Sequence, residues 1–407
     1  ILKVLLKMMK SETKDYGDYK LNVLYKWGWM ILSNKKIFQL VTVSKSIPLM
    51  KGQIEYLRNK GLDVHVVSSE GPEQNTYSSD ITHVVNMERE ISLKNDLKSL
   101  INMIKLFKKE KPYIVNSGTP KAGLIGTLAA FITRRPVRIY TVRGLRLETV
   151  TGLKYKILYA MEKLAMLCAT DIIAISESLK DKIVELGLEK KEHIKVLGHG
   201  SSNGINIDNF SKNNNAIPQQ IKEKLANHFV IGYVGRIVRD KGIHEMIEAF
   251  KLVQKKHNKV KLLIVGPIEK DDSISSKDYQ YLQNNPDIIM TGHVNDTVSY
   301  YNHMDVLVFP TYREGFGNVS IEAQAVEVPV IVNNVTGAKD TLIDKVTGYL
   351  VKKGDFEQIA QKIEYLINHP SLKEEMGKNG RRRVEEKFRN EIVWKHLETI
   401  YKNNLPI

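Results

Sequence analysis

Short apolar runs rich in β-branched residues alternate along this chain with longer segments in which apolar residues recur at helical spacing. The first case is a strand at 36–43, a helical period closing at Gly61 and a second strand at 64–67. Strand, helix and strand within about 30 residues form a βαβ unit, whose strands pair in parallel. The alternation runs through both halves and predicts an α/β fold of doubly wound parallel sheets.

The remaining elements follow the same pattern. Helices are expected at 96–111, 124–132 and 155–169, and Ser176 is expected to cap the helix after a strand at 171–175. Further strands are expected at 113–115, 137–141, 194–197, 229–234, 261–265, 288–291, 305–309, 328–332 and 349–351. A final helix is expected at 390–403.

The length of 407 residues exceeds one ordinary core and fits two domains. A polar stretch at 213–220 is the best linker candidate. The predicted organisation is an N-terminal extension at 1–34, a first domain at 35–207, a linker at 208–226, a second domain at 227–389, and a C-terminal helix at 390–407.

The net charge of +15 is concentrated in the first half. Residues 1–207 hold 33 Lys and Arg against 20 Asp and Glu, which gives +13, whereas 28 against 26 over residues 208–407 give +2. Such a field attracts nucleic acid, an anionic membrane leaflet or a phosphorylated acceptor. We expect no nucleic-acid partner, because no recognition motif for one accompanies the charge.

Cysteine content and hydropathy set further limits. Cys168 is the only cysteine, so an internal disulfide and Cys-rich metal sites are excluded, and a reducing cytoplasm is favoured. No apolar run reaches the roughly 18 to 20 residues of a membrane span. The basic amphipathic helix at 96–111 has either a solvated face or a membrane-contacting one, and residues 1–34 are either a plain extension or an interfacial anchor using Trp27 and Trp29.

The most informative stretch is 305–322, DVLVFPTYREGFGNVSIE, which predicts a strand, a loop and a helix N-terminus. We expect Asn318 or Ser320 to cap a helix beginning at Ile321. The glycines at 315 and 317 let the backbone approach a ligand, and the helix start offers free N–H groups to an anion such as diphosphate.

Two carboxylates flank this expected anion site. Glu314 lies in the loop and Glu322 lies about one turn into the helix. Both carboxylates could accept hydrogen bonds from the hydroxyls of a nucleotide sugar. Two glutamates at this spacing also have a simpler explanation, in which Glu314 is solvated in the loop and Glu322 complements the helix dipole.

A second loop with candidate ligand-binding residues follows the strand at 229–234. Gly235 ends that strand, and Arg236 and Lys241 lie on either side of the next helix start. Two cations with helix amides make a diphosphate pocket. The spacing is neither a Walker motif nor a dinucleotide G-x-G-x-x-G, which argues against ATPases and dehydrogenases.

Glu-Gly-Phe-Gly-Asn at 314–318, Ile-Glu-Ala after it and Gly-Arg-x4-Lys-Gly at 235–242 resemble the signatures of the retaining glycosyltransferases of family 4. The resemblance implies a GT-B fold, in which two Rossmann-like domains face each other across a cleft. It gives catalytic roles to Arg236, Lys241 and Glu314. It gives donor-binding roles to Gly52, Arg143, Gly235, Gly266, Gly315, Phe316, Gly317, Asn318 and Glu322.

One segment departs from the family pattern. Asn-Ser-Gly-Thr-Pro-Lys-Ala-Gly at 116–123 is similar to a family segment that usually reads His-Thr-His-Thr-Pro-Lys-Ala-Gly. Asn116 and Gly118 replace both histidines, so no histidine role is expected there. The loop around Arg143, Val-Arg-Gly-Leu-Arg-Leu-Glu-Thr, resembles one from a polysaccharide-assembly branch of the family.

The resemblance implies transfer of a sugar from a nucleotide-sugar donor, with UDP-sugar expected, to a polyprenyl-diphosphate-linked saccharide acceptor in O-antigen or capsule biosynthesis. It implies no metal and no cofactor, and a cytoplasmic enzyme bound peripherally to the anionic inner face of the cell membrane. Two alternatives stay open, a nucleotide-sugar 2-epimerase of the same fold and a non-catalytic polyanion-binding protein.

Overall fold

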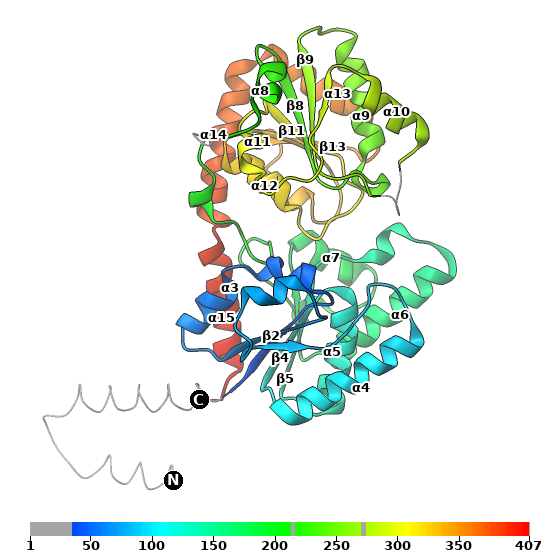
Figure 1. The fold of residues 1–407 in the computed structure, drawn as a ribbon, viewed down its shortest axis with the longest axis vertical. Coiled ribbons are helices and arrows are strands. Elements are labelled where there is room, and N and C mark those ends of the chain that lie inside the picture. The colour runs from blue at the N-terminus through cyan, green and yellow to red at the C-terminus, as the bar shows by residue number, and fades with distance from the viewer. Residues whose placement is uncertain (1–34, 213–215, 270–273, 407) are drawn as a thin grey trace, which may run out of the picture.

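The chain folds into two α/β domains joined side by side, each with a parallel sheet between layers of helices (Figure 1). The computed structural model describes residues 35–212, 216–269 and 274–406. The expected N-terminal extension with Trp27 and Trp29, and part of the expected linker, therefore lie outside the described residues.

The first sheet has seven strands in the order β3-β2-β1-β4-β5-β6-β7, and every neighbouring pair is parallel. Its strands are β1 (Ile37–Leu40), β2 (Val64–Ser68), β3 (Thr82–Val84), β4 (Ile114–Gly118), β5 (Val137–Val142), β6 (Asp171–Ala174) and β7 (Ile194–Val196). Strands β1, β2 and β4 are buried along their whole length, because helices cover both faces of the sheet.

The second sheet has six strands in the order β10-β9-β8-β11-β12-β13, again all parallel. Its strands are β8 (Phe229–Val234), β9 (Val260–Val265), β10 (Ile288–Met290), β11 (Val306–Phe309), β12 (Val330–Asn333) and β13 (Gly348–Val351). The strand order changes direction beside β8, which is where doubly wound sheets bind ligands. The prediction of two doubly wound parallel sheets is confirmed.

The α-helices of the first half are α3 (Gln53–Asn59), α4 (Leu93–Glu110), α5 (Pro120–Ile132), α6 (Gly152–Cys168) and α7 (Glu177–Glu185). Those that follow are α8 (Gln219–Leu225), α9 (Ile243–Gln254), α10 (Ser276–Asn284), α11 (Val298–Tyr301), α12 (Asn318–Ala325), α13 (Phe356–Asn368), α14 (Pro370–Lys387) and α15 (Asn390–Asn404). The Ser176 hydroxyl accepts the amide of Leu179 at the start of α7, so the predicted cap is confirmed.

Helix α5 is the most apolar helix of the first domain, and it packs between α4 and α6 with most of its side chains buried. The fold thus accounts for this apolar stretch as an inner helix. Within the part of the chain that the structure describes, no helix is both long and apolar enough to cross a bilayer.

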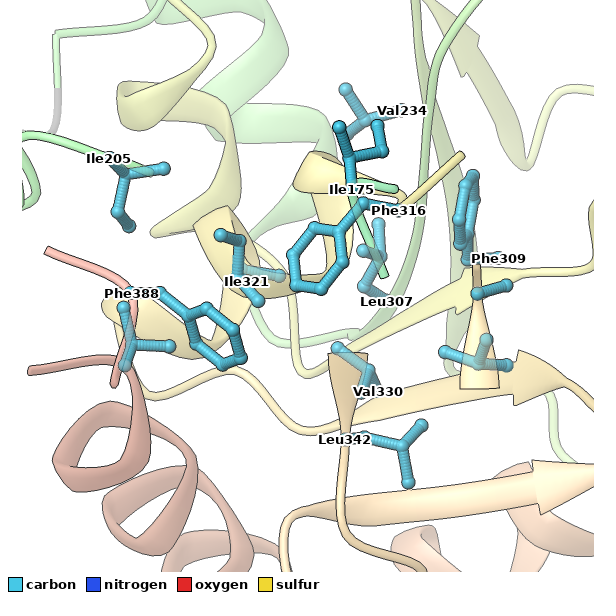
Figure 2. Close-up of a cluster of buried hydrophobic side chains, with 14 of the residues drawn as sticks. Ile175, Ile205, Val234, Leu307, Phe309, Phe316, Ile321, Val330, Leu342 and Phe388 are labelled. Carbon is cyan, nitrogen blue, oxygen red and sulfur yellow. The ribbon is translucent and has the colours of Figure 1, made fainter. Parts of the chain in front are cut away.

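A hydrophobic cluster joins the two domains (Figure 2). Ile175 of the first domain lies next to Phe316 of the second, and the ring of Phe316 is 5.2 Å from that of Phe388. Phe316 is only 2% exposed. Because this apolar contact is shared, it fixes the domains relative to each other in this structure.

The last helix, α15, leaves the second domain and packs against the first beside α3 (Figure 1). The buried hydroxyl of Tyr401 accepts hydrogen bonds from Gln39 at 3.0 Å and Asn116 at 2.7 Å, on neighbouring strands β1 and β4. The side chain of Tyr56 on α3 also donates to Glu398 at 2.8 Å. The first domain is therefore completed by the end of the chain.

Candidate active site between the two domains

The parallel strands β8, β9 and β11 end at one edge of the second sheet, and their loops meet there. Gly235 and Gly266, the residues after β8 and β9, lie back to back, so closely that a Cβ on Gly266 would clash with the carbonyl of Gly235. This contact explains the glycine at 266, whereas Gly235 has a φ of 146°, which favours glycine. Because neither residue has a side chain, the backbone at this edge of the sheet is open to a ligand.

Lys241 and Glu314, which stand in the loops after β8 and β11, form an ion pair. Both side chains are 18% exposed, and Thr311 adds a hydroxyl to the Glu314 carboxylate at 3.3 Å. The backbone amide of Tyr312 also donates to the carbonyl of Asp240 at 2.9 Å. The structure therefore brings together two residues that the sequence predicts to be catalytic and that are 73 positions apart.

Arg236 stands at the start of the same loop but points toward solvent. It pairs with Glu269 at 2.7 Å, and the two side chains are 50% and 42% exposed. Its carbonyl accepts the hydroxyl of Tyr233, which is buried. The backbone of Arg236 is therefore anchored while its guanidinium can exchange one anionic partner for another.

The predicted start of the helix after β11 is wrong. Helix α12 begins at Asn318, three residues earlier than expected, and neither Asn318 nor Ser320 caps it with a side chain. Gly317 is the N-cap residue, with a φ of 86° that favours glycine. The Asn318 side chain instead accepts a hydrogen bond from Ser201 of the first domain at 3.2 Å, and Ser320 is buried beside Thr341.

The remaining residues of this loop face the first domain. The carbonyl of Gly315 accepts the Ser176 hydroxyl at 2.8 Å, and a Cβ at Gly315 would clash with the carbonyl of Arg143. The Phe316 side chain is occupied by the interdomain cluster. Donor binding by Gly315, Phe316, Gly317 and Asn318 therefore rests on their backbone amides and stays a prediction.

Glu322 lies one turn into α12, and its carboxylate accepts the hydroxyl of Tyr301 at 2.8 Å. Burial raises the pKa of Glu322 above its ordinary value, and the hydrogen bond from Tyr301 offsets this only in part. A partly buried carboxylate whose second oxygen has no hydrogen-bond partner among the described residues suits a ligand hydroxyl. Tyr301 was not foreseen, because only the fold brings α11 next to α12.

In the first domain, Arg143 occupies the space that the missing histidine would fill. A Cβ on Gly118 would lie 2.9 Å from Nε of Arg143. Nε and Nη1 of Arg143 are buried without a hydrogen-bond partner among the described residues, and burial lowers its pKa to about 10. The guanidinium borders a polar cavity of about 10 Å³ that is also lined by Asn116 and Thr141.

The other residues of this altered motif have structural tasks. Asn116 accepts the Thr141 hydroxyl at 2.7 Å and donates to Tyr401, so both ends of its amide are used. Lys121 is buried and bonds to Asp96 and to the carbonyl of Glu90, which anchors the start of α4. Neither side chain is left free for a substrate.

Gly52, assigned to donor binding from the first loop of the fold, packs under α15. A Cβ on Gly52 would lie 2.7 Å from the indole of Trp394, and that indole donates to Asn203 at 2.6 Å. Close packing thus accounts for this glycine, and its role at a donor stays a prediction.

A pocket of about 530 Å³ lies between the domains, on the side of α6 and α7. Glu148 on its wall accepts the hydroxyl of Thr336 from the second domain at 2.7 Å, and burial raises the pKa of Glu148. Ser178 at the start of α7 also bonds to Asp340 and to the amide of Gly337. No sequence signal marks these contacts, because single polar residues after strands are common.

Comparison with known proteins gives two family matches. A family described as "Glycosyl transferases group 1" matches residues 216–383, and a family described as "Glycosyl transferase 4-like" matches residues 36–176. The first range contains the loops of Lys241 and Glu314, and the second contains the altered motif at 116–123. Together the two matches cover most of both domains.

Among curated proteins, the chain is 61% identical to "Capsular polysaccharide biosynthesis glycosyltransferase CapM" of Staphylococcus aureus, over 92% of this chain and 98% of that protein. It is 26% identical to "UDP-Gal:alpha-D-GlcNAc-diphosphoundecaprenol alpha-1,3-galactosyltransferase" of Escherichia coli, over 83% of this chain and 90% of that protein.

Solved structures agree with the fold. Sucrose-phosphate synthase from Thermosynechococcus elongatus is 21% identical with a TM-score of 0.74, and covers 91% of this chain and 98% of its own. Alr3699/HepE of Anabaena in complex with UDP-glucose is 19% identical with the same TM-score, over 90% of this chain and 99% of its own. The predicted GT-B fold is thereby confirmed. The chain belongs to the group 1 glycosyl transferases, the family 4 type that its motifs resemble, and is a glycosyltransferase.

Proposed function

We propose that this enzyme transfers a sugar from a UDP-sugar, with retention at the anomeric carbon, and that the loops after β8, β9 and β11 hold the donor. The observation that carries the proposal is the ion pair of Lys241 and Glu314 beside the loop of Arg236, at the edge of the sheet where Gly235 and Gly266 lie. The name of the Anabaena structure, a complex with UDP-glucose, supports the choice of nucleotide.

The leaving diphosphate is stabilised by charge. Arg236 can turn from Glu269 to a phosphate because that ion pair is half exposed, and Lys241 is already held at the loop by Glu314. The amides at the start of α12 add donors and the positive end of a helix dipole. Glu322 binds the ribose hydroxyls and Glu314 binds those of the transferred sugar.

The acceptor proton passes to the departing phosphate oxygen in a front-face reaction. No imidazole stands at positions 116 and 118, and the amide of Asn116 is engaged at both ends. Arg143 cannot act as a base, since a guanidinium stays protonated at neutral pH even with a pKa of about 10. It can stabilise negative charge on the donor.

The reaction is proposed to need no metal, because Lys241 and, once it leaves Glu269, Arg236 supply two positive charges to the diphosphate. Of the residues that the structure describes, His244, Glu248 and Asp278 form the group whose spacing would suit a metal ion. They lie on α9 and α10, outside the loops that hold Lys241 and Glu314. Chelation is therefore not expected to stop transfer.

The proposed acceptor is a saccharide on a polyprenyl diphosphate, used to build a surface polysaccharide. The Staphylococcus aureus relative is named for capsular polysaccharide biosynthesis, and the Escherichia coli relative is named for a diphosphoundecaprenol-linked acceptor. Such an acceptor lies in a bilayer, so the enzyme would work at the cytoplasmic membrane surface.

The test is a thermal-shift screen of UDP-, GDP- and ADP-sugars, followed by transfer assays with the donor that stabilises the protein most. We expect UDP-sugars to raise the melting temperature and the sugar to move to a diphosphate-linked acceptor. Binding of no nucleotide sugar would refute the proposal. Formation of an isomer from the donor alone would establish the epimerase alternative instead.

A further inference from the structure

Arg143 follows β5 directly, and the first domain encloses most of its guanidinium without pairing it. Nε and Nη1 of Arg143 are buried and have no hydrogen-bond partner among the described residues. No other partly buried arginine of the described residues has such a nitrogen. A buried charge without a partner destabilises a folded protein. A bound anion would therefore stabilise this part of the molecule.

A second partly buried arginine is paired by the fold itself. Arg383 on α14 donates to the carbonyl of Thr341 at 2.7 Å and to that of Asp340 at 2.8 Å. Burial lowers the pKa of Arg383 and that of Arg143 alike, in each case to about 10. The two arginines thus lie in similarly dry surroundings, but only Arg383 has its donors filled by the protein.

The cavity beside Arg143 can receive only a small group that accepts hydrogen bonds. Its volume is about 10 Å³, which is room for about one water-sized group and too little for a sugar ring. None of the described residues that line it is acidic. A water molecule there would accept a hydrogen bond but leave the charge of the guanidinium uncompensated. A carboxylate oxygen would do both.

Arg143 stands against the loop that is proposed to hold the transferred sugar. A Cβ on Gly315 would clash with the carbonyl of Arg143, and a Cβ on Gly144 would lie 3.4 Å from the amide nitrogen of Gly315, so the backbones of the two loops touch. Glu314, the neighbour of Gly315, is the residue proposed to bind hydroxyls of that sugar. An acidic group on the same sugar would meet Arg143 on the side of the first domain.

The diphosphate has cations of its own in the second domain. Arg236 and Lys241 stand in the loop after β8, whereas the guanidinium of Arg143 lies against Gly118 at the end of β4. The described residues that line its cavity belong to the first domain and to α15. Arg143 is therefore placed to meet a second negative group, separate from the diphosphate.

We propose that the transferred sugar carries a carboxylate, so that the donor is the UDP derivative of a uronic acid, and that the guanidinium of Arg143 binds this carboxylate. Arginine suits the task because its planar fork pairs with a carboxylate through two parallel hydrogen bonds and stays charged at neutral pH. Arg143 thus selects the sugar, while Arg236 and Lys241 hold the nucleotide. The proposal rests on the proposed function, whose donor and sugar loop it uses.

The test is isothermal titration of the full chain with UDP alone and with two matched pairs of donors. The pairs are UDP-glucuronic acid with UDP-glucose, and UDP-galacturonic acid with UDP-galactose. In at least one pair the uronate should bind about 10- to 150-fold more tightly than the neutral sugar, which is the range for a hydrogen bond to a charged group. Absence of any preference for the uronate in both pairs would overturn the proposal.

Variants of Arg143 locate the source of the preference. Arg143→Met should abolish it and leave the Kd of UDP nearly unchanged, whereas Arg143→Lys keeps the charge without the fork and should retain part of it. Gly118→Ala, whose Cβ would lie 2.9 Å from Nε and push the guanidinium aside, should weaken binding of the uronate but not of UDP. If Arg143→Met weakens UDP as much as the uronate, Arg143 contacts the diphosphate and the proposal is overturned.

Thermal midpoints of the unliganded variants give a readout that does not depend on the choice of donor. Arg143→Met should raise the midpoint, since it removes a buried charge that has no partner. The matched control Arg383→Met should lower it, since it leaves the carbonyls of Asp340 and Thr341 without their donors. A lower midpoint for Arg143→Met would overturn the proposal, because Arg143 would then stabilise the fold without any anion.

The titrations also separate this proposal from the one on which it rests. They contain no acceptor, so a carboxylate on the acceptor cannot produce the preference. If UDP binds and all four UDP-sugars bind alike, only the assignment of the carboxylate fails. If neither UDP nor any UDP-sugar binds, the proposed function itself is refuted.

Discussion

Replacement of Arg236 by alanine separates donor binding from stability. Among the described residues, the ion-pair partner of the Arg236 side chain is Glu269, and both side chains are about half exposed. An ion pair of this kind contributes about 0–1 kcal/mol to folding. Arg236→Ala is therefore expected to leave the thermal midpoint nearly unchanged.

The same substitution should weaken nucleotide binding strongly. A hydrogen bond to a charged group contributes about 1.5–3 kcal/mol, which corresponds to about a 10- to 150-fold rise in Kd. Isothermal titration with UDP measures this change directly. Glu269→Gln should act in the opposite direction, because it frees the guanidinium from its competing partner.

Arg239→Ala is the matched control. Arg239 is exposed in the same loop, so its loss changes the net charge equally, and we expect a shift in Kd of about threefold or less from long-range field alone. If Arg236→Ala binds UDP as the unaltered protein does, the site is misplaced. If Arg236→Ala and Arg239→Ala weaken UDP binding equally, the overall positive charge explains the effect and no direct phosphate contact is needed. Either result would refute the role proposed for Arg236.

Four further outcomes are expected. Lys241→Ala should slow transfer by about tenfold or more and also lower the thermal midpoint, because it leaves the half-buried Glu314 unpaired; a variant with unaltered kcat would contradict the assignment. Glu322→Gln should raise the midpoint at neutral pH yet weaken donor binding. Burial raises the pKa of Glu322, so the folded state binds this proton more tightly than the unfolded state does. The stability that the proton adds is therefore present below pH 4.5 and is lost as the pH rises through the higher pKa of the folded state. Thermal midpoints measured at several pH values should vary less for the Gln variant than for the unaltered protein. Gly315→Ala should slow transfer by tenfold or so, since its Cβ would clash with the carbonyl of Arg143 and force the domains apart, which small-angle scattering would detect as a larger radius. EDTA should leave the rate unchanged, and restoration of a lost rate by Mg²⁺ would contradict metal independence.

Apolar patterning was enough to predict the strands that matter for the site. The strands before Gly235 and Pro310 are buried on both faces, so their sequences are continuous apolar runs that end at a turn signal. Strand β3, with Thr82, His83 and Val84, was missed because three residues at a partly exposed edge carry no such signal.

Tertiary contacts decided what the sequence could not. Local preference favoured Asn318 or Ser320 as a cap, yet Gly317 starts α12 because the side chains of both polar residues are used elsewhere. Gly118 leaves room for the guanidinium of Arg143, which lies 25 positions further along the sequence. Such pairs are separated by many residues, and one sequence does not report that they touch.

Helix α15 follows the second domain in the sequence, although it packs against the first. The surfaces around Gln39 and Asn116 that Tyr401 covers stay open until the second domain and α15 have been translated. The N-terminal half therefore leaves the ribosome with an unfilled groove under Trp394 and Tyr401, and it reaches its final packing only after the second half has folded. A gene cut between the halves would yield an N-terminal fragment that aggregates, unless a peptide of residues 390–404 is supplied with it.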